Sequence, residues 1–225
     1  MHTSLTQRIT AIQHSITELE ARYQRTPHAV NLLAVSKTQS ASTIASAYQA
    51  GLRHFGENYV QEARQKQQLL GAFDITWHFI GPIQANKTKA IAQHFDWVHS
   101  VDSVKIAQRL SQQRPSTLAP LNICLQVNIS AEASKSGIAL DALQRTCEHI
   151  ASLPKLQLRG VMAIPAPETD FNLQCYPYQR LYQATQALDK FTLDCFSFGM
   201  SGDLAAAIKE GATWVRLGTA LFGAR

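Results

Sequence analysis

The chain has 225 residues, of which 45% are hydrophobic and 16% are charged, and its formal net charge is +5. This composition excludes an intrinsically disordered protein and is sufficient for one sizeable hydrophobic core. The cations are scattered along the chain, which argues against nucleic-acid binding. No apolar run is long enough to span a membrane. We therefore expect a cytoplasmic protein without nucleic-acid or membrane partners.

The cysteines and histidines do not form a recognisable ligand pattern. There is no CxxC pair and no HExxH motif among the four cysteines and eight histidines. The cysteines are Cys124, Cys147, Cys175 and Cys195. We expect reduced, buried thiols and no metal site.

The first segment predicts an amphipathic helix at about residues 4–24. Its apolar residues recur in steps of three and four, which is the helical period. They are Leu5, Ile9, Ile12, Ile16, Leu19 and Tyr23. The segment lacks the continuous apolar core of a signal peptide, so we expect an extra helix preceding the main fold.

From residue 31 onward, short apolar runs alternate with helical patterns. The predicted strands are residues 31–36, 54–57, 76–81, 96–100, 121–129, 156–164, 194–200 and 213–219. The predicted helices are residues 40–51, 59–70, 86–94, 103–113, 140–152, 171–190 and 202–211. This order predicts one α/β domain over residues 1–225, a (β/α)8 TIM barrel. A doubly wound open sheet is the alternative fold.

The predicted strand ends carry residues suited to holding a ligand. Functional sites of such barrels lie at the C-terminal ends of the strands. Lys37 follows the first strand and Asn58 follows the second. Ser201 follows the seventh strand, and Gly218 and Thr219 end the eighth. Small residues allow backbone N–H groups to approach an anion, so these last two loops favour phosphate binding over simple tight turns.

Arg216 is expected to point into the top of the barrel. It lies two residues before Gly218, and residues two apart on a strand face the same side. A buried arginine needs a partner, which is either a ligand or an ion pair with Asp203 or Glu57. His78 lies inside a predicted strand and is expected to be a hydrogen-bonded core histidine.

The sequence lacks both the nucleophile elbow of serine hydrolases and the glycine motif of dinucleotide-binding proteins. The stretch "GMSGD" departs from the nucleophile elbow because Asp203 stands where the second glycine is required. We interpret Asp203 as a helix cap. No GxGxxG sequence occurs, which argues against a dinucleotide site.

A lysine beside a phosphate site indicates carbonyl chemistry. A lysine amine forms a Schiff base with a carbonyl, so both pyridoxal 5′-phosphate (PLP) and a phosphorylated sugar in an aldolase fit these residues. The two hypotheses differ at the pyridine nitrogen of PLP. An arginine facing that nitrogen would keep it unprotonated, and PLP would then be a poor electron sink.

The chain resembles the PLP homeostasis proteins, which are built like the N-terminal domain of alanine racemase (fold type III). The resemblance rests on the motifs "LLAVSKTQ", "HFGENYVQEA", "WHFIGPIQANK", "QVNISAEASKSGI", "GVMAIPAP" and "SFGMSGDLAAAIKEGATWVRLGTALFGAR". It implies cofactor contacts from Lys37, Asn58, Ser201, Arg216, Gly218 and Thr219. Lys37 would carry PLP as an internal aldimine, Ser201 would bind the phosphate, and Arg216 would face the pyridine nitrogen.

The resemblance also implies a function in vitamin B6 balance. The chain would bind and buffer PLP and deliver it to apo PLP-dependent enzymes, and we expect a monomer. The tyrosines that could supply a second catalytic base fall on predicted helices or in the proline-broken loop, so we expect a carrier and not an efficient enzyme. A weak racemase-like enzyme and a regulatory protein that senses PLP for a partner are the alternatives.

Further polar residues border the predicted site. Lys135 is interpreted as an exposed loop lysine, with a second PLP contact as the alternative. Gln84, Asn86 and Lys87 follow the third strand and could line the same rim.

Overall fold

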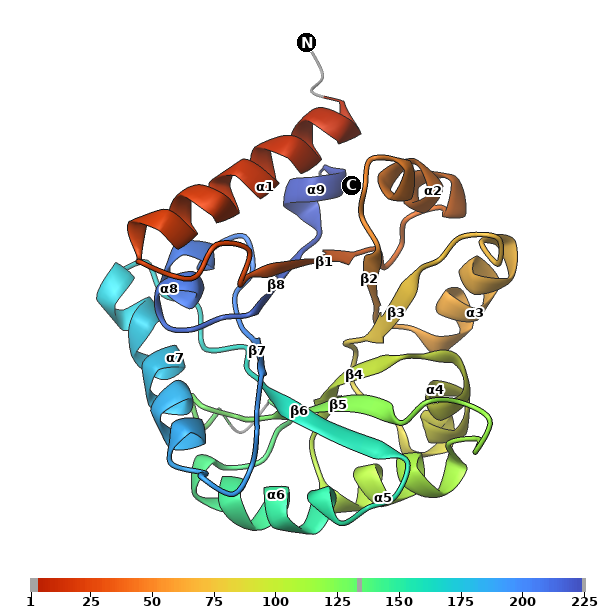
Figure 1. Cartoon of the computed structure of the whole chain (residues 1–225), viewed down its shortest axis with the longest axis vertical. Coiled ribbons are helices and arrows are strands. Elements are labelled where there is room, and N and C mark those ends of the chain that lie inside the picture. Colours follow the sequence, from red (N-terminus) through yellow and green to blue (C-terminus); the bar gives the residue numbers. More distant parts are fainter. Residues whose placement is uncertain (1–3, 133–134, 224–225) are drawn as a thin grey trace.

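Eight parallel strands close into a barrel in the computed structural model, which describes residues 4–132 and 135–223 (Figure 1). The strands are β1 (Asn31–Val35), β2 (His54–Glu57), β3 (Thr76–Phe79), β4 (Trp97–Val101), β5 (Leu121–Gln126), β6 (Leu156–Met162), β7 (Cys195–Ser197) and β8 (Trp214–Leu217). Each strand pairs with the next in sequence, and β8 pairs with β1 over the register Asn31↔Trp214 to Ala34↔Leu217. The predicted TIM barrel is therefore confirmed, and the open-sheet alternative is wrong.

Helices surround the strands on the outside of the barrel (Figure 1). They are α2 (Ala41–Gln49), α3 (Val60–Leu69), α4 (Thr88–His94), α5 (Val104–Gln113), α6 (Leu143–Ala151), α7 (Phe171–Gln186) and α8 (Leu204–Lys209), with a short α9 (Thr219–Phe222) after β8. Two 3₁₀ turns, η1 (Ala85–Lys87) and η2 (Leu140–Ala142), lead into α4 and α6. None of the helices in the described ranges is both long and apolar enough to cross a membrane.

The additional N-terminal helix forms as α1 (Leu5–Arg22). Ser4 caps it by accepting a hydrogen bond from the Gln7 N–H, and the Gln7 side chain accepts from the Ser4 N–H. The predicted apolar stripe packs on the main hydrophobic core. Figure 1 shows α1 lying outside the barrel, against α8 and α9.

One strand and one helix end earlier than the sequence predicts. The fifth strand was expected to reach residue 129, but β5 ends at Gln126. The chain then turns, because the Asn128 side chain donates to the carbonyls of Glu132 and Lys135 and fixes a loop there. Helix α7 ends at Gln186, four residues before the predicted end.

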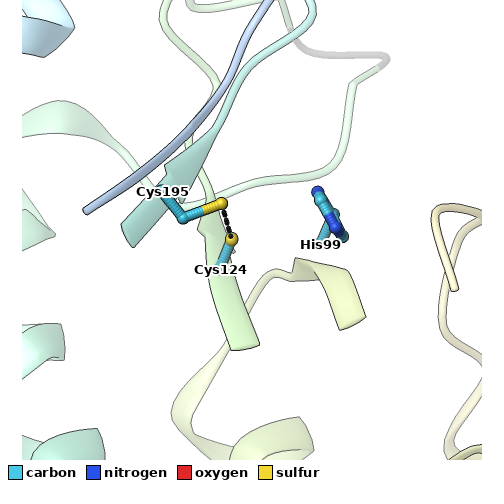
Figure 2. A group of neighbouring side chains, drawn as sticks. All are labelled: His99, Cys124 and Cys195. Atoms are coloured by element: carbon cyan, nitrogen blue, oxygen red, sulfur yellow. Dashed lines mark hydrogen bonds between the residues drawn. The ribbon is translucent and has the colours of Figure 1, made fainter. Parts of the chain in front are cut away.

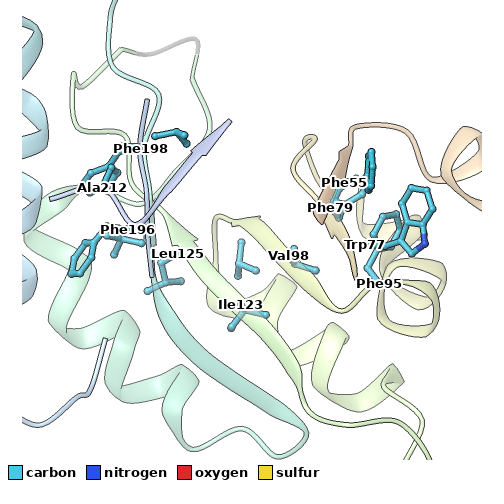
Figure 3. Packing of buried hydrophobic residues seen from close by; sticks show 14 of the residues in the cluster. Phe55, Trp77, Phe79, Phe95, Val98, Ile123, Leu125, Phe196, Phe198 and Ala212 are labelled. Carbon is cyan, nitrogen blue, oxygen red and sulfur yellow. The ribbon is translucent and has the colours of Figure 1, made fainter. Parts of the chain in front are cut away.

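Alternation along the strands produces two separate packing zones. Outward side chains pack under the helices, as Phe55, Trp77 and Phe79 do in Figure 3. Inward side chains form a smaller cluster inside the barrel, consisting of Leu33, Trp97, Cys124, Met162, Cys195 and Trp214. Because the strand period is two, the residues between the outward ones, such as His78, must face this interior.

Candidate functional site

One cavity of about 340 Å³ opens at the C-terminal ends of the strands. Its lining residues are Val35, Lys37, Asn58, Ile80, Ile164, Met200, Ser201, Gly202, Arg216, Gly218 and Thr219. All six residues that the sequence singled out for cofactor contacts lie on this wall. They come from β1, β2, β7 and β8, which are distant in sequence and become neighbours only when the barrel closes.

Lys37 enters the cavity from the loop after β1. The loop turns sharply, with Thr38 at a φ of 65° and Gln39 N–H bonded to the Ser36 carbonyl at 2.9 Å. The Lys37 amine makes no hydrogen bond or ion pair with the described part of the chain. It is half-buried, and it is therefore placed to meet a ligand and not to stabilise the fold.

The loop after β7 presents backbone donors to the cavity. Gly199 adopts a φ of 84°, and a Cβ there would lie 2.5 Å from the Ala207 side chain, so only glycine fits. The N–H groups of Ser201, Gly202 and Thr219 have no hydrogen-bond partner among residues 4–132 and 135–223. These unpaired donors suit an anion.

Asp203 shapes this loop in a way that differs from the predicted helix cap. It occupies the N-cap position of α8 but makes no side-chain capping bond. Its carboxylate instead accepts from Met200 N–H at 2.7 Å and from the Tyr178 hydroxyl at 2.6 Å. Burial, and next the Asp203 carboxylate, raise the pKa of Tyr178, so this phenol remains a hydrogen-bond donor.

Arg216 is 4% exposed and points into the barrel top, as period two predicted. Its Nη1 donates to the carbonyl and the hydroxyl of Ser197, and its Nη2 donates to the Ala163 carbonyl at 3.0 Å. A guanidinium has five N–H groups, so the Nε–H and one Nη2–H have no partner among the described residues. Burial lowers the pKa of Arg216 from its ordinary value.

The ion-pair alternative for Arg216 is wrong. Glu57 is fully buried, but its side chain lies on the same outward side of β2 as Phe55, where it bonds Lys66 of α3 at 2.8 Å and Ser36 at 2.5 Å. Burial raises the pKa of Glu57, although Lys66 opposes this. The Asp203 carboxylate accepts from Met200 in the loop after β7 and from Tyr178 on α7. Arg216 is therefore held by neutral oxygens alone.

Asn58 has a buried polar atom, Oδ1, without a hydrogen-bond partner within the described residues. An unpaired buried polar atom costs about 1–3 kcal/mol. Because Asn58 lines the cavity, a ligand that donates a hydrogen bond would satisfy this oxygen.

Other residues considered from the sequence lie apart from this cavity. Gln84 and Lys87 line a separate hollow of about 220 Å³. Lys135 is not a freely exposed lysine: its amine pairs with Glu132 at 2.6 Å and donates to the Ile164 and Pro165 carbonyls. It borders adjoining cavities, not the one that holds Lys37.

Two cysteines meet inside the barrel, which the sequence did not indicate. Cys124 and Cys195 share a register row with Gly160 between them, and their sulfurs lie 3.1 Å apart (Figure 2). Ligand atoms of His99 and both thiols lie within 4.8 Å of one another. However, both nitrogens of His99 are already hydrogen-bonded, and burial raises the pKa of Cys124. The group is therefore a buried thiol contact.

Comparison with known proteins gives a consistent family. The alanine racemase N-terminal domain model matches residues 8–225. A pyridoxal phosphate homeostasis protein of Pseudomonas aeruginosa is 54% identical over 222 residues, which cover 99% of this chain and 96% of that protein. Structures of PipY from Synechococcus elongatus superpose with TM-scores of 0.82 without PLP and 0.79 with PLP bound, at 38% and 37% identity, each covering 92% of this chain and 100% of PipY. The chain belongs to the alanine racemase N-terminal domain family and, within it, to the pyridoxal phosphate homeostasis proteins.

Proposed function

We propose that this chain binds PLP in the cavity at the top of the barrel and serves PLP homeostasis. The observation that carries the proposal is the meeting of an unpaired amine, unpaired backbone donors and a buried guanidinium on one wall. An aldehyde, a phosphate and a pyridine nitrogen are the complementary groups of PLP. The names of the relatives and the PLP-bound structure of PipY support the same ligand.

Each residue has a proposed contact. The Lys37 amine forms a covalent C=N bond with the cofactor aldehyde, and water leaves. The N–H groups after β7 and β8, together with the Ser201 hydroxyl, bind the phosphate, while Gly218 keeps that loop close to β1. Arg216 donates to the pyridine nitrogen, and the Asn58 amide completes the polar contacts.

The cavity favours holding PLP over catalysing a reaction on it. Lys37 and Arg216 are the only titratable side chains on its described wall. Arginine remains protonated in proteins, so Lys37 alone can exchange a proton with a ligand. Tyr178 contacts the loop after β7, but its hydroxyl already donates to the Asp203 carboxylate and accepts from the Gly199 N–H. A racemase needs a base on each face of its substrate, and this wall provides one.

The proposed carrier role includes release. Ser201, Gly202 and Thr219 are exposed at the cavity mouth, so a bound cofactor has a direct path outward. We propose that a monomer in the cytoplasm buffers PLP and delivers it to apo PLP-dependent enzymes. Light scattering coupled to size exclusion tests the monomer, and a dimer at working concentration would contradict it.

A spectroscopic titration tests binding and delivery together. PLP is added to the apo-protein and the visible absorbance of the C=N bond is followed, for wild type, Lys37→Ala and the control Lys87→Ala. Wild type and the control should develop the band, and Lys37→Ala should not. Holo-protein should then restore activity to an apo PLP-dependent enzyme. Absence of the band in wild type would refute the proposal.

A further inference from the structure

A continuous line of hydrogen bonds runs through the barrel interior to Arg216. Its steps are His54 Nδ1 to His78 Nε2 at 3.0 Å, His78 Nδ1 to His99 Nε2 at 2.9 Å, and His99 Nδ1 to Ser197 Oγ at 2.8 Å. The Ser197 hydroxyl then accepts from Arg216 Nη1 at 2.9 Å. Figure 2 shows His99 in the interior beside the thiol pair. The line joins the start of β2 to the ligand cavity.

The arginine sets the direction of every proton in this line. Arg216 can only donate, so it occupies a lone pair of Ser197 Oγ. The hydroxyl hydrogen of Ser197 then has one acceptor among the described residues, His99 Nδ1. His99 must therefore carry its proton on Nε2 and donate to His78 Nδ1. By the same logic His78 donates from Nε2 to His54, and all N–H bonds point away from the cavity.

The histidines are suited to this neutral, oriented state. His78 and His99 are fully buried, and desolvation is the first cause that lowers the pKa of each. Desolvation also lowers the pKa of His54, at the start of β2. The negative charge of Asp96 opposes this shift. The rings of Trp97 and Trp214 flank His78 at 5.5 and 5.0 Å. Arg216 is the charged group at the upper end.

This line of hydrogen bonds explains how the buried guanidinium of Arg216 is stabilised without a carboxylate partner. A buried charge needs a partner or oriented dipoles. Hydrogen bonds in a chain polarise one another, so a hydroxyl that donates onward is a stronger acceptor. We infer that Ser197, His99 and His78 are positioning residues that stabilise Arg216 through aligned neutral dipoles and leave its cationic charge and two free N–H groups for the ligand.

This inference rests on the proposed function only for the identity of the ligand. A carboxylate beside Arg216 would neutralise its positive charge. The line of neutral side chains leaves that charge in place. The protons of the line face away from the cavity, so Ser197 has none to give upward. Arg216 is therefore a hydrogen-bond donor of fixed orientation, and an unprotonated pyridine nitrogen is an acceptor that suits it.

The tautomers can be read directly in the apo-protein. Histidine is labelled with ¹⁵N, and long-range ¹H–¹⁵N correlations are recorded near neutral pH. We expect His78 and His99 to be neutral with the proton on Nε2. The result that overturns the inference is a proton on Nδ1 of either ring, or a charged imidazolium. This readout requires no PLP, so it stands even if the chain binds another ligand.

Two serine substitutions separate positioning from packing. Ser197→Ala removes the link between His99 and Arg216. Ser111→Ala is the matched control, because Ser111 is also buried and donates to one carbonyl, that of Pro154 at 2.6 Å, outside the barrel interior. We expect Ser197→Ala to shift the His99 Nδ1 resonance and to weaken PLP binding about tenfold. The control should change neither.

Equal PLP affinity of folded Ser197→Ala and wild type would overturn the inference. If Ser197→Ala does not fold, His54→Leu at the half-buried end of the line provides the second test. It removes the acceptor of His78, and we expect the His78 and His99 nitrogen resonances both to move. A shift confined to His78 contradicts a coupled line. If wild type binds no PLP, the proposed function fails, while the tautomers still decide the inference.

Discussion

Acid is predicted to destabilise the barrel through its buried histidines. The pKa of His99 is lowered from 6.5 to about 3, first because of burial and next because of Arg216. Below pH 6.5 the unfolded chain takes up a proton that the folded chain does not, so the free energy of unfolding falls as the pH falls. Above pH 6.5 His99 is neutral in both states and contributes no pH dependence.

The size of the effect follows from that shift. Each pH unit between the two pKa values costs about 1.4 kcal/mol. From pH 6.5 to about 4.5, His99 alone therefore removes about 2.7 kcal/mol, and its contribution stops near pH 3. His78 changes in the same direction, since its pKa is lowered by the same burial.

Urea unfolding followed by far-UV circular dichroism measures this slope. Wild type, His99→Gln and the control His149→Gln are compared from about pH 7.5 to about 4.5. His99→Gln should lose stability near neutral pH but show a shallower slope, by about 1.4 kcal/mol per pH unit below pH 6. The control, an exposed residue of α6, should follow wild type. Parallel curves for wild type and His99→Gln would refute the reasoning.

Two further substitutions test the packing of the barrel wall. Gly160→Ala places a Cβ 1.8 Å from the Cys195 carbonyl oxygen, so we expect a loss of at least about 3 kcal/mol in urea unfolding or no soluble protein; wild-type stability would contradict the packing described. Lys66→Met leaves the carboxylate of Glu57 buried without its cation, and we expect a loss of about 3–5 kcal/mol. Lys66→Met that is as stable as wild type at neutral pH would show that the pair is not needed.

The sequence predicts which residues share one rim of the barrel, because strand ends are a local property. Each strand is recognisable from its apolar run, and parallel strands in a barrel bring their C-terminal residues to one rim. Lys37 and Thr219 could therefore be assigned to one mouth without knowledge of the register. The direction of Arg216 also followed from local alternation.

The sequence does not predict the partners that face each other across the interior. Arg216 bonds Ser197 and not a carboxylate. The register of β7 against β8 places the Ser197 hydroxyl beside the Arg216 guanidinium. The bond from His99 on β4 to Ser197 on β7 spans strands that are not neighbours in the sheet. Neither arrangement has a signature in sequence spacing, since both depend on how far the closed barrel shears.

The most direct test of the account is the position of the covalent bond to PLP. Holo-protein is reduced with borohydride, which adds hydride to the C=N bond and fixes the cofactor on its amine, and the digested peptides are analysed by mass spectrometry. We predict one pyridoxyl group on Lys37, and none on Lys135 or Lys87 at one equivalent of PLP. Modification mainly at another lysine, or none in reduced wild type, would contradict the assignment of the cavity.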